Sequence, residues 1–444
     1  MTASTNIGAA PGVNTSANEQ EQNRVYAKVF WRIMPFLMLC YVIAYLDRVN
    51  VGFAKLQMSV DLGFSETVFG LGAGVFFLGY FLFEVPSNIL MHKVGARVWI
   101  ARIMITWGIL SAAFMYVETP LQFYVLRFLL GLAEAGFAPG VLLYLTYWFP
   151  KKERGKAVAG FMLATVLSSV VGAPLSGYLL SSTHGWFGLS GWQWMFILEG
   201  VPAVIMGVVT FFYLVDRPEQ GNWLNQEERR WLTTTLAAEQ EKNAVHAQHE
   251  FREIFRDKRM WILTLIYMFN AVAIYGVVLW LPQIVKSLGG LNNFQTGIVS
   301  AIPFICAAVG LVLVARSSDR TGERKMHTAC AGLFGGVFLA ASALVPSPVL
   351  GLVLICIAAM GLWATLGVFW TLPTQFLSGA AAAGGIAMIN GFAQIGGFIG
   401  PYLVGWIRET THSFSMALLV LAVSPMIGFV LCSTLKIRND RAPE

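Results

Sequence analysis

The chain has 444 residues, of which 56% are hydrophobic and only 12% are charged, and its net charge is +6. A soluble domain has roughly 25% charged residues, so this chain has too little charge to cover a water-facing surface. Its mean hydropathy of +0.64 indicates an integral membrane protein. The basic residues lie between apolar runs rather than on one patch, which argues against a nucleic-acid partner.

The first 25 residues are small and polar, without a basic segment followed by an apolar one. They predict a disordered N-terminal tail and no cleavable signal peptide. The five cysteines lie singly in or beside apolar runs, and no Cys/His cluster occurs. We therefore expect neither a metal site nor a disulfide framework.

A helix needs about 20 mostly apolar residues to cross a membrane. Twelve such segments occur in two groups of six, which predicts an all-α polytopic membrane protein with two six-helix halves. The segments cover residues 30–55, 67–91, 98–117, 121–146, 156–180 and 193–215, then 260–282, 296–316, 326–345, 349–373, 383–407 and 414–435.

These segments divide the chain into expected regions: a tail (1–25), a first bundle (26–215), a central cytoplasmic loop (216–259), a second bundle (260–436) and a C-terminal tail (437–444). The central loop is polar, but it carries apolar side chains that favour a segment lying against the membrane surface, namely Trp223, Leu224, Trp231 and Leu232.

The Lys and Arg residues predict the orientation of the chain. With both termini in the cytoplasm, 25 of the 30 lie on the cytoplasmic side. Only Lys55, Lys286 and Arg408 lie outside, and Arg48 and Arg127 lie within spans. This distribution follows the positive-inside rule.

Two similar turns occupy equivalent places in the two halves. HKVGAR (92–97) follows the second span and DRTGER (319–324) follows the eighth. The pairing indicates duplicated six-helix units, as in secondary transporters that bind substrate between the halves at the membrane midplane. We expect charged side chains in these turns to act at a cytoplasmic gate, namely Arg97, Asp319, Arg320 and Arg324.

The DRTGER turn and the RFLLGLAEAGFAPG stretch (127–140) resemble signatures of the major facilitator superfamily. More narrowly, YLDRVNVGFA (45–54), GYFLFEVPSN (79–88) and GWQWMFILEGVPA (191–203) resemble the anion:cation symporter family. Among its members, the chain is most similar to bacterial permeases for tartrate, hydroxyphenylacetate, phthalate and related carboxylates. The first-half signature usually has Asp where this chain has His92. The resemblance therefore does not support a gate held closed by an acidic side chain of that turn.

The candidate intramembrane charges all lie in the first-half spans: Asp47, Arg48, Glu84, Arg127, Glu134 and Glu199. A charge at mid-membrane costs about 2.5–3.5 kcal/mol even on a lenient scale, so such residues usually face a cavity, form pairs or change protonation. Asp47 and Arg48 diverge by about 100° on a helix, so they do not easily share one partner. The alternative for this pair is a boundary position at the membrane surface.

Arg127 and Glu134 are two helical turns apart and project from one face, where they could also form an internal salt bridge. Tyr41 and Tyr45 share a face with Arg48 and add phenol donors to its guanidinium, an arrangement suited to a carboxylate. The family resemblance implies proton-coupling roles for Asp47 and Glu134. It also implies that Arg48 or Arg127, with Tyr45, takes part in substrate binding or in proton coupling.

Other candidates carry less weight. Tyr80 is expected either to line the cavity or to pack, and the resemblance favours Asn390 as a substrate contact. Gln394, Trp370 and Thr371 fit either the cavity or interhelical packing. Structural roles are favoured for two acids: Glu84, as a partner of gate-loop bases, and Glu199, as an acceptor at a helix break near Pro202.

These features predict a proton-coupled importer of a small organic anion, tartrate-like or aromatic, in the bacterial inner membrane. It is expected to be no enzyme, to need no cofactor beyond the proton gradient, and to work as a monomer within the lipid bilayer. An exporter or antiporter on the same fold is the alternative, because VVGAPLSG (170–177) partly resembles an antiporter motif. No catalytic or nucleotide-binding motif supports a membrane enzyme or receptor.

Overall fold

The computed structural model describes residues 15–244, 256–375 and 379–435. The first half contains α1 (Thr15–Leu62), α2 (Glu66–Val94), α3 (Ala96–Ala113), α4 (Pro120–Glu134), α5 (Phe137–Thr146), α6 (Lys151–Ser182) and α7 (Gly191–Tyr213). After α8 (Gln226–Ala244), the second half contains α10 (Lys258–Lys286), α11 (Asn293–Thr321), α12 (Lys325–Leu344), α13 (Pro348–Phe369), α14 (Gly379–Thr411) and α15 (Phe414–Thr434). Short 3-10 turns join some of them, at Phe114–Tyr116, Trp186–Gly188, Pro218–Gln220 and Pro373–Gln375.

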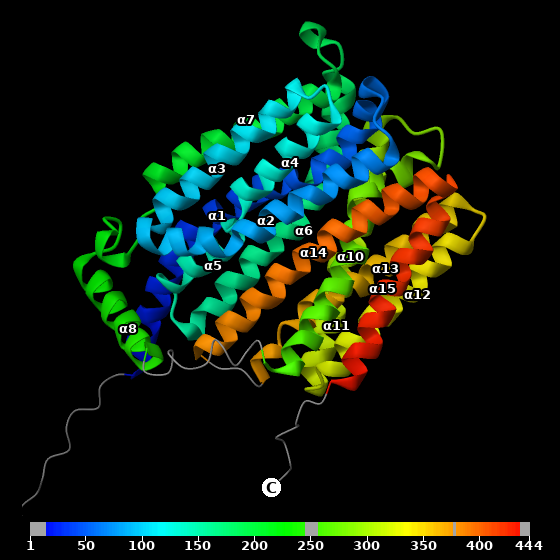
Figure 1. Cartoon of the computed structure of the whole chain (residues 1–444). Coiled ribbons are helices and arrows are strands. Elements are labelled where there is room, and N and C mark those ends of the chain that lie inside the picture. Colours follow the sequence, from blue (N-terminus) through cyan, green and yellow to red (C-terminus); the bar gives the residue numbers. More distant parts are fainter. Residues whose placement is uncertain (1–14, 245–255, 376–378, 436–444) are drawn as a thin grey trace, which may run out of the picture.

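The long helices form two bundles that lie side by side (Figure 1). Between the bundles, α2 packs on α14, α6 packs on α11, and α1 packs on α10. We call the end of the molecule that carries turns 92–97 and 319–324 the basic end. The other end, which carries Lys55, Lys286 and Arg408, is the Lys55 end.

The helices are long and apolar enough for a membrane protein. Within the described residues, eleven spans qualify by length and composition, with α4 and α5 together forming one of them. The twelfth expected span is α14, whose 33 residues reach about 50 Å. Its eight glycines and the amides of Asn390 and Gln394 make it less apolar than the others.

The outward faces of the helices confirm a multi-pass membrane protein. On α11, one exposed stripe consists of apolar residues three or four positions apart, namely Ile298, Ile302, Ile305, Val309 and Val312. Residues at this spacing share a helix face. A face of this kind suits lipid rather than water, because exposed apolar area costs about 25 cal/mol per Å² in water.

Two expectations about the polar segments need correction. Residues 15–25, expected in the disordered tail, are the first turns of α1; residues 1–14 and the C-terminal tail at 437–444 lie outside the described residues. In the central loop, Leu232 is fully buried, and the Trp231 ring lies 5.2 Å from that of Tyr26 on α1. These apolar side chains therefore pack on the first half, because α1 extends far enough to cover them.

The two halves approach most closely at the Lys55 end. A Cβ on Gly70 of α2 would lie 2.6 Å from the Pro401 carbonyl oxygen and 3.1 Å from the Gly405 Cα on α14. A Cβ on Gly177 of α6 would lie 2.4 Å from the Asn293 carbonyl oxygen at the start of α11. Only glycine allows backbones this close. The Lys55 end is therefore closed in this structure.

Candidate functional site

The central feature of the site is a buried ion pair between Arg48 of α1 and Glu134 of α4. Arg48 is 9% exposed and Glu134 is 3% exposed. α1 runs unbroken through residues 47 and 48 to Leu62, and the burial of both residues inside the bundle favours an interior site over a solvent-facing pair at the membrane surface. The two charges compensate each other, as a buried pair must.

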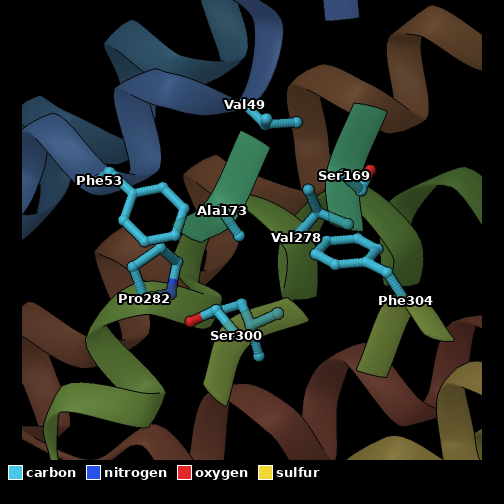
Figure 2. Close-up of a pocket in the computed structure, with 9 residues that line it drawn as sticks. Val49, Phe53, Ser169, Ala173, Val278, Pro282, Ser300 and Phe304 are labelled. Carbon is cyan, nitrogen blue, oxygen red and sulfur yellow. The ribbon is translucent and has the colours of Figure 1, made fainter. Parts of the chain in front are cut away.

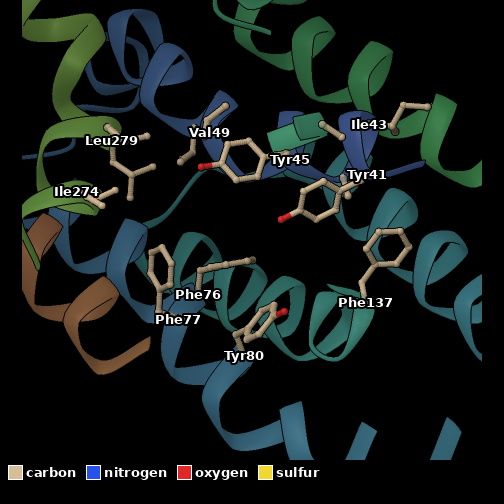
Figure 3. Close-up of a cluster of buried hydrophobic side chains, with 14 of the residues drawn as sticks. Tyr41, Ile43, Tyr45, Val49, Phe76, Phe77, Tyr80, Phe137, Ile274 and Leu279 are labelled. Atoms are coloured by element: carbon tan, nitrogen blue, oxygen red, sulfur yellow. The ribbon is translucent and has the colours of Figure 1, made fainter. Parts of the chain in front are cut away.

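Aromatic rings surround the Arg48 guanidinium. Its Cζ lies 5.1 Å from the Tyr80 ring centroid, 5.5 Å from that of Phe76 and 5.8 Å from that of Tyr45. Figure 3 shows Tyr41 and Tyr45 of α1 facing Phe76 and Tyr80 of α2. Ring faces within about 6 Å stabilise a cation, and phenol groups can also bind an anion.

Glu134 owes its position to a break in the helix. The sequence predicts one continuous span at 121–146, but the structure divides this segment into two helices. α4 ends at Glu134 and α5 starts at Phe137, with Gly136 between them at φ +88°. A Cβ on Gly136 would lie 2.3 Å from the Ser87 Oγ of α2. Glycine is thus required both by the backbone angle and by the close approach of α2.

Arg127 lies apart from this ion pair, and the salt bridge with Glu134 that its spacing allowed is not formed, because Glu134 pairs with Arg48. The Arg127 side chain is fully buried and donates to the backbone carbonyls of Gly72 and Ala73 on α2, at 3.3 and 3.2 Å. Its Nη1 has no hydrogen-bond partner among the described residues. Arg127 therefore joins α4 to α2 and keeps one donor open.

Asp47 faces away from Arg48, as expected for neighbours on a helix. Its carboxylate accepts hydrogen bonds from Trp107 Nε1 (3.0 Å) and Ser111 Oγ (2.6 Å) of α3. Asn50 Nδ2 adds a third at 3.2 Å. Asp47 is 1% exposed, so it lies within the first bundle rather than between the halves.

Asn390 of α14 crosses to the first half and donates a hydrogen bond to Glu84 of α2. The expectation that Glu84 pairs with gate-loop bases is therefore wrong, because its carboxylate meets an amide from the other half. Glu84 is 5% exposed and also lies within electrostatic range of Arg48. This contact places an acidic group beside the Arg48 site, on the side toward the basic end.

Sequence reasoning missed several polar partners. Tyr275 of α10 brings a phenol from the second half into electrostatic range of Arg48, and its ring lies 4.4 Å from that of Phe77. Trp107 and Ser111 are the partners of Asp47. Sequence spacing could not predict these contacts, because the partners lie on different helices. The one available indication was that each is a polar residue within an apolar span.

A pocket lies beside the site, between α1, α6, α10 and α11 (Figure 2). Its walls are apolar apart from two hydroxyls, on Ser169 and Ser300. Val49, the neighbour of Arg48, forms part of the wall. Arg48 and Glu134 are not among its lining residues, so the pocket lies at the interface between the halves but separate from the ion pair.

The two turns at the basic end hold their charges differently. In the second half, Arg324 pairs with Asp319 at 2.5 Å, while Arg320 is exposed. In the first half, Asp216 accepts a hydrogen bond from the Arg97 backbone N–H at 2.8 Å and lies 4.0 Å from its side chain. An acid therefore serves this turn despite His92, but it comes from the segment after α7.

The Lys55 end carries a second charged cluster that joins the halves. Glu66 of α2 lies 3.0 Å from Lys55 Nζ and 3.4 Å from Arg408 Nε of α14. Lys55 is 6% exposed, and its Nζ lies 4.9 Å from the Trp280 ring centroid of α10. Glu409 also accepts hydrogen bonds from Ser65 Oγ and the Thr67 N–H, at 2.8 and 2.6 Å.

This chain is similar to known proteins in both its sequence and its fold. The chain matches the Major Facilitator Superfamily over residues 37–401 and 290–444. A protein of Agrobacterium vitis named "Putative tartrate transporter" is 49% identical over 421 residues, which cover 95% of this chain and 93% of the relative.

Two further relatives carry different names. The quinolone resistance transporter of Acinetobacter baumannii is 41% identical over 92% of this chain and 94% of its own. The inner membrane transport protein RhmT of Escherichia coli K12 is 42% identical over 93% and 95%.

Among solved structures, a bacterial homologue of the human lysosomal transporter Spinster, in an inward-facing and unoccupied conformation, has the same fold. It superposes with a TM-score of 0.74 at 18% identity, covering 93% of this chain and 98% of the homologue. Together with the two six-helix bundles and the buried charges at their interface, these matches show that the chain is a membrane transporter, not an enzyme, and belongs to the Major Facilitator Superfamily.

Proposed function

We propose that this protein imports a small organic anion together with protons across the bacterial inner membrane, with both termini in the cytoplasm. The substrate is a carboxylate, either a tartrate-like hydroxy acid or an aromatic acid. The observation that carries the proposal is the Arg48–Glu134 pair, a cation and a titratable acid that compensate each other inside an apolar bundle. The tartrate name of the Agrobacterium vitis relative supports the substrate class.

The pair links proton binding to anion binding through charge balance. Protonation of Glu134 leaves the Arg48 charge without a partner, and uncompensated buried charges cost about 3–5 kcal/mol. A substrate carboxylate restores the balance, and the Tyr45 and Tyr80 rings beside Arg48 help to hold it. Each ligand therefore favours the binding of the other.

Alternating access then moves the loaded site from one side of the membrane to the other. From the periplasm, Glu134 and Asp47 take up protons, and the carboxylate binds Arg48. The halves rock, the Lys55 end closes and the basic end opens toward the cytoplasm. When Glu134 loses its proton there, it pairs again with Arg48 and displaces the anion.

Other candidate residues have supporting roles in this proposal. Arg127 contributes positive potential and an Nη1 donor that has no partner among the described residues. Asn390 contacts the substrate from the second half. The charged turns, with Arg97, Asp319, Arg320 and Arg324, act at the cytoplasmic gate. One copy of the chain contains all of these groups, so we propose a functional monomer.

Export by proton antiport is the second candidate, and the quinolone resistance name of the Acinetobacter baumannii relative favours it. The Gly177 contact gives the antiporter-like VVGAPLSG stretch a different explanation, namely close packing of α6 on α11. Everted membrane vesicles separate the two candidates. Substrate accumulation in right-side-out vesicles supports import, whereas proton-driven accumulation in everted vesicles supports export.

The central test uses Glu134→Gln in proteoliposomes. Gln keeps the shape of the protonated acid, so Arg48 stays available and substrate exchange at equal pH should persist. Uptake driven by a pH gradient should be lost, because the acid whose protonation frees Arg48 for the substrate is gone. Glu219→Gln, at an exposed residue of the central loop, is the matched control. Gradient-driven accumulation by Glu134→Gln would refute the role of Glu134.

A further inference from the structure

Glu84 of α2 is a buried acid that the proposed transport cycle does not use. It is 5% exposed, and its Oε1 accepts a hydrogen bond from the Asn390 amide of α14. Its Oε2 is buried and has no hydrogen-bond partner among the described residues. A Cβ on Gly391 of α14 would lie 4.0 Å from this oxygen. Glu84 therefore keeps one acceptor atom open where the two halves meet.

Contacts along α2 give the order of three charged groups. Arg127 donates to the Ala73 carbonyl. The Arg48 Cζ lies 5.1 Å from the Tyr80 ring centroid, and Glu84 follows Tyr80 by four residues on the same helix face. Ala73 and Glu84 are about 16 Å apart along the helix axis, so Arg127 lies on the far side of Arg48 from Glu84. Arg127 therefore cannot compensate a second negative charge placed beside Glu84.

The surroundings of Glu84, as far as the structure describes them, compensate its charge poorly. The titratable groups within electrostatic range are Tyr80 of its own helix and Tyr267 of α10. Arg48 of α1 also lies in range, but its guanidinium belongs to the ion pair described above. α14 contributes the neutral amide of Asn390. The charge on Glu84 is thus balanced by an amide hydrogen bond and by a cation that already has a partner.

A carboxylate ligand that binds Arg48 and reaches Asn390 in the other half ends beside Glu84. The Asn390 amide has two N–H donors, so it can bind a ligand oxygen and remain bonded to Glu84. An ionised Glu84 only accepts hydrogen bonds, and its open Oε2 suits a hydroxyl of the ligand. A second carboxylate at this place would repel Glu84, unless Glu84 carried a proton and donated its O–H.

We infer that Glu84 selects the charge of the substrate, an inference that rests on the proposed function. With Glu84 ionised, the site takes a monocarboxylate whose far end carries a hydroxyl. A dicarboxylate binds together with one more proton, which is taken from solvent and held on Glu84 Oε2. The protonated Glu84 then donates its O–H to the second carboxylate. The protein thus takes up one further proton when its substrate carries one further negative charge.

Binding of two matched acids to the purified full-length protein tests this role. Threonate and tartrate share a carboxylate and two hydroxyls on a four-carbon chain, but threonate ends in a CH₂OH group where tartrate has a second carboxylate. Both acids are fully ionised near neutral pH, because ordinary carboxyl pKa values are about 4. Calorimetry should give a ratio of threonate affinity to tartrate affinity that rises with pH, by up to about tenfold per pH unit. Protonation of Glu134 precedes the binding of either acid and cancels in this ratio.

Glu84→Gln should make the ratio independent of pH, because its amide does not titrate and can donate to the second carboxylate at every pH. Glu199→Gln is the matched control. Glu199 of α7 is 2% exposed and accepts a hydrogen bond from Ser176 Oγ at 2.8 Å. Its expected place at a helix break near Pro202 is wrong, because α7 runs unbroken from Gly191 to Tyr213. This control should keep the pH dependence of the parent protein.

Three results would overturn the inference: a parent protein that binds neither acid, a pH-independent ratio in the parent protein, or a pH-dependent ratio that Glu84→Gln retains. The first two need no variant, so they decide the matter even if Glu84→Gln does not fold. Uptake that ignores an imposed pH gradient would instead refute the proposed function. The binding ratio needs no gradient and would stand.

Discussion

The charged cluster at the Lys55 end should hold the two halves together, and Glu66→Gln should weaken this contact. Glu66 compensates Lys55 of its own half and Arg408 of the other half, at 3.0 and 3.4 Å. Lys55 is 6% exposed and lies between the Phe69 and Trp280 rings, at 5.3 and 4.9 Å. Without Glu66, two cations remain close together in a poorly hydrated place.

The expected size of the effect follows from this burial. Removal of one partner from a buried ion pair costs roughly 3–5 kcal/mol. The Glu66 side chain is 29% exposed, so solvent screens part of the interaction and about 2 kcal/mol is a better value. This penalty falls on the closed state, because opening exposes Lys55 and Arg408 to water. The ratio of open to closed molecules should rise about 30-fold.

Distances between spin labels measure this ratio. Glu118 and Pro346 are exposed residues in loops at the Lys55 end, one in each half. With the five cysteines replaced and labels at these two sites, Glu66→Gln should shift the distance distribution toward longer values.

Asp61→Asn is the matched control for this substitution. It removes the same charge at the same end, but Asp61 binds Ser190 and Trp192 within its own half. Unchanged distances in Glu66→Gln, or an equal shift in Asp61→Asn, would refute this role of Glu66.

Three further predictions concern other contacts. Gly177→Ala should prevent closure at the Lys55 end and reduce uptake at least tenfold, because its Cβ would lie 2.4 Å from the backbone of α11. Gly172→Ala is the control and should keep most uptake, because its Cβ would meet only the Leu46 side chain. Equal losses of uptake in the two variants would contradict the packing argument. Asp216→Asn should lower the free energy of unfolding by about 1 kcal/mol, measured as a lower Tm, because it weakens the hydrogen bond and ion pair with Arg97; an unchanged Tm would exclude this role. Hydrogen bonds from Thr67 and Ser65 lower the pKa of Glu409, so its contact with α2 is complete above the ordinary carboxyl range and is lost as the pH falls through the lowered pKa. Label distances at the Lys55 end should therefore lengthen with acid, and less so in Glu409→Gln; an identical pH response in that variant would count against the contact.

The amino-acid sequence by itself determined the membrane-spanning helices, the two halves and the family. These properties depend on local composition: apolar runs set the spans, and the repeated turns at 92–97 and 319–324 reveal the duplication. It also predicted that Asp47 and Arg48 lie inside the membrane and point in different directions, because helix geometry relates neighbouring residues directly.

Tertiary structure decided which of these charges meet. Glu134 pairs with Arg48, 86 residues away, rather than with Arg127 on its own helix, because the break at Gly136 and the packing of α2 set its position. Asn390 reaches Glu84 across 306 residues, and Asp216 supplies the acid that His92 does not. Such partners depend on how helices from distant parts of the chain pack together, and sequence spacing carries no information on that.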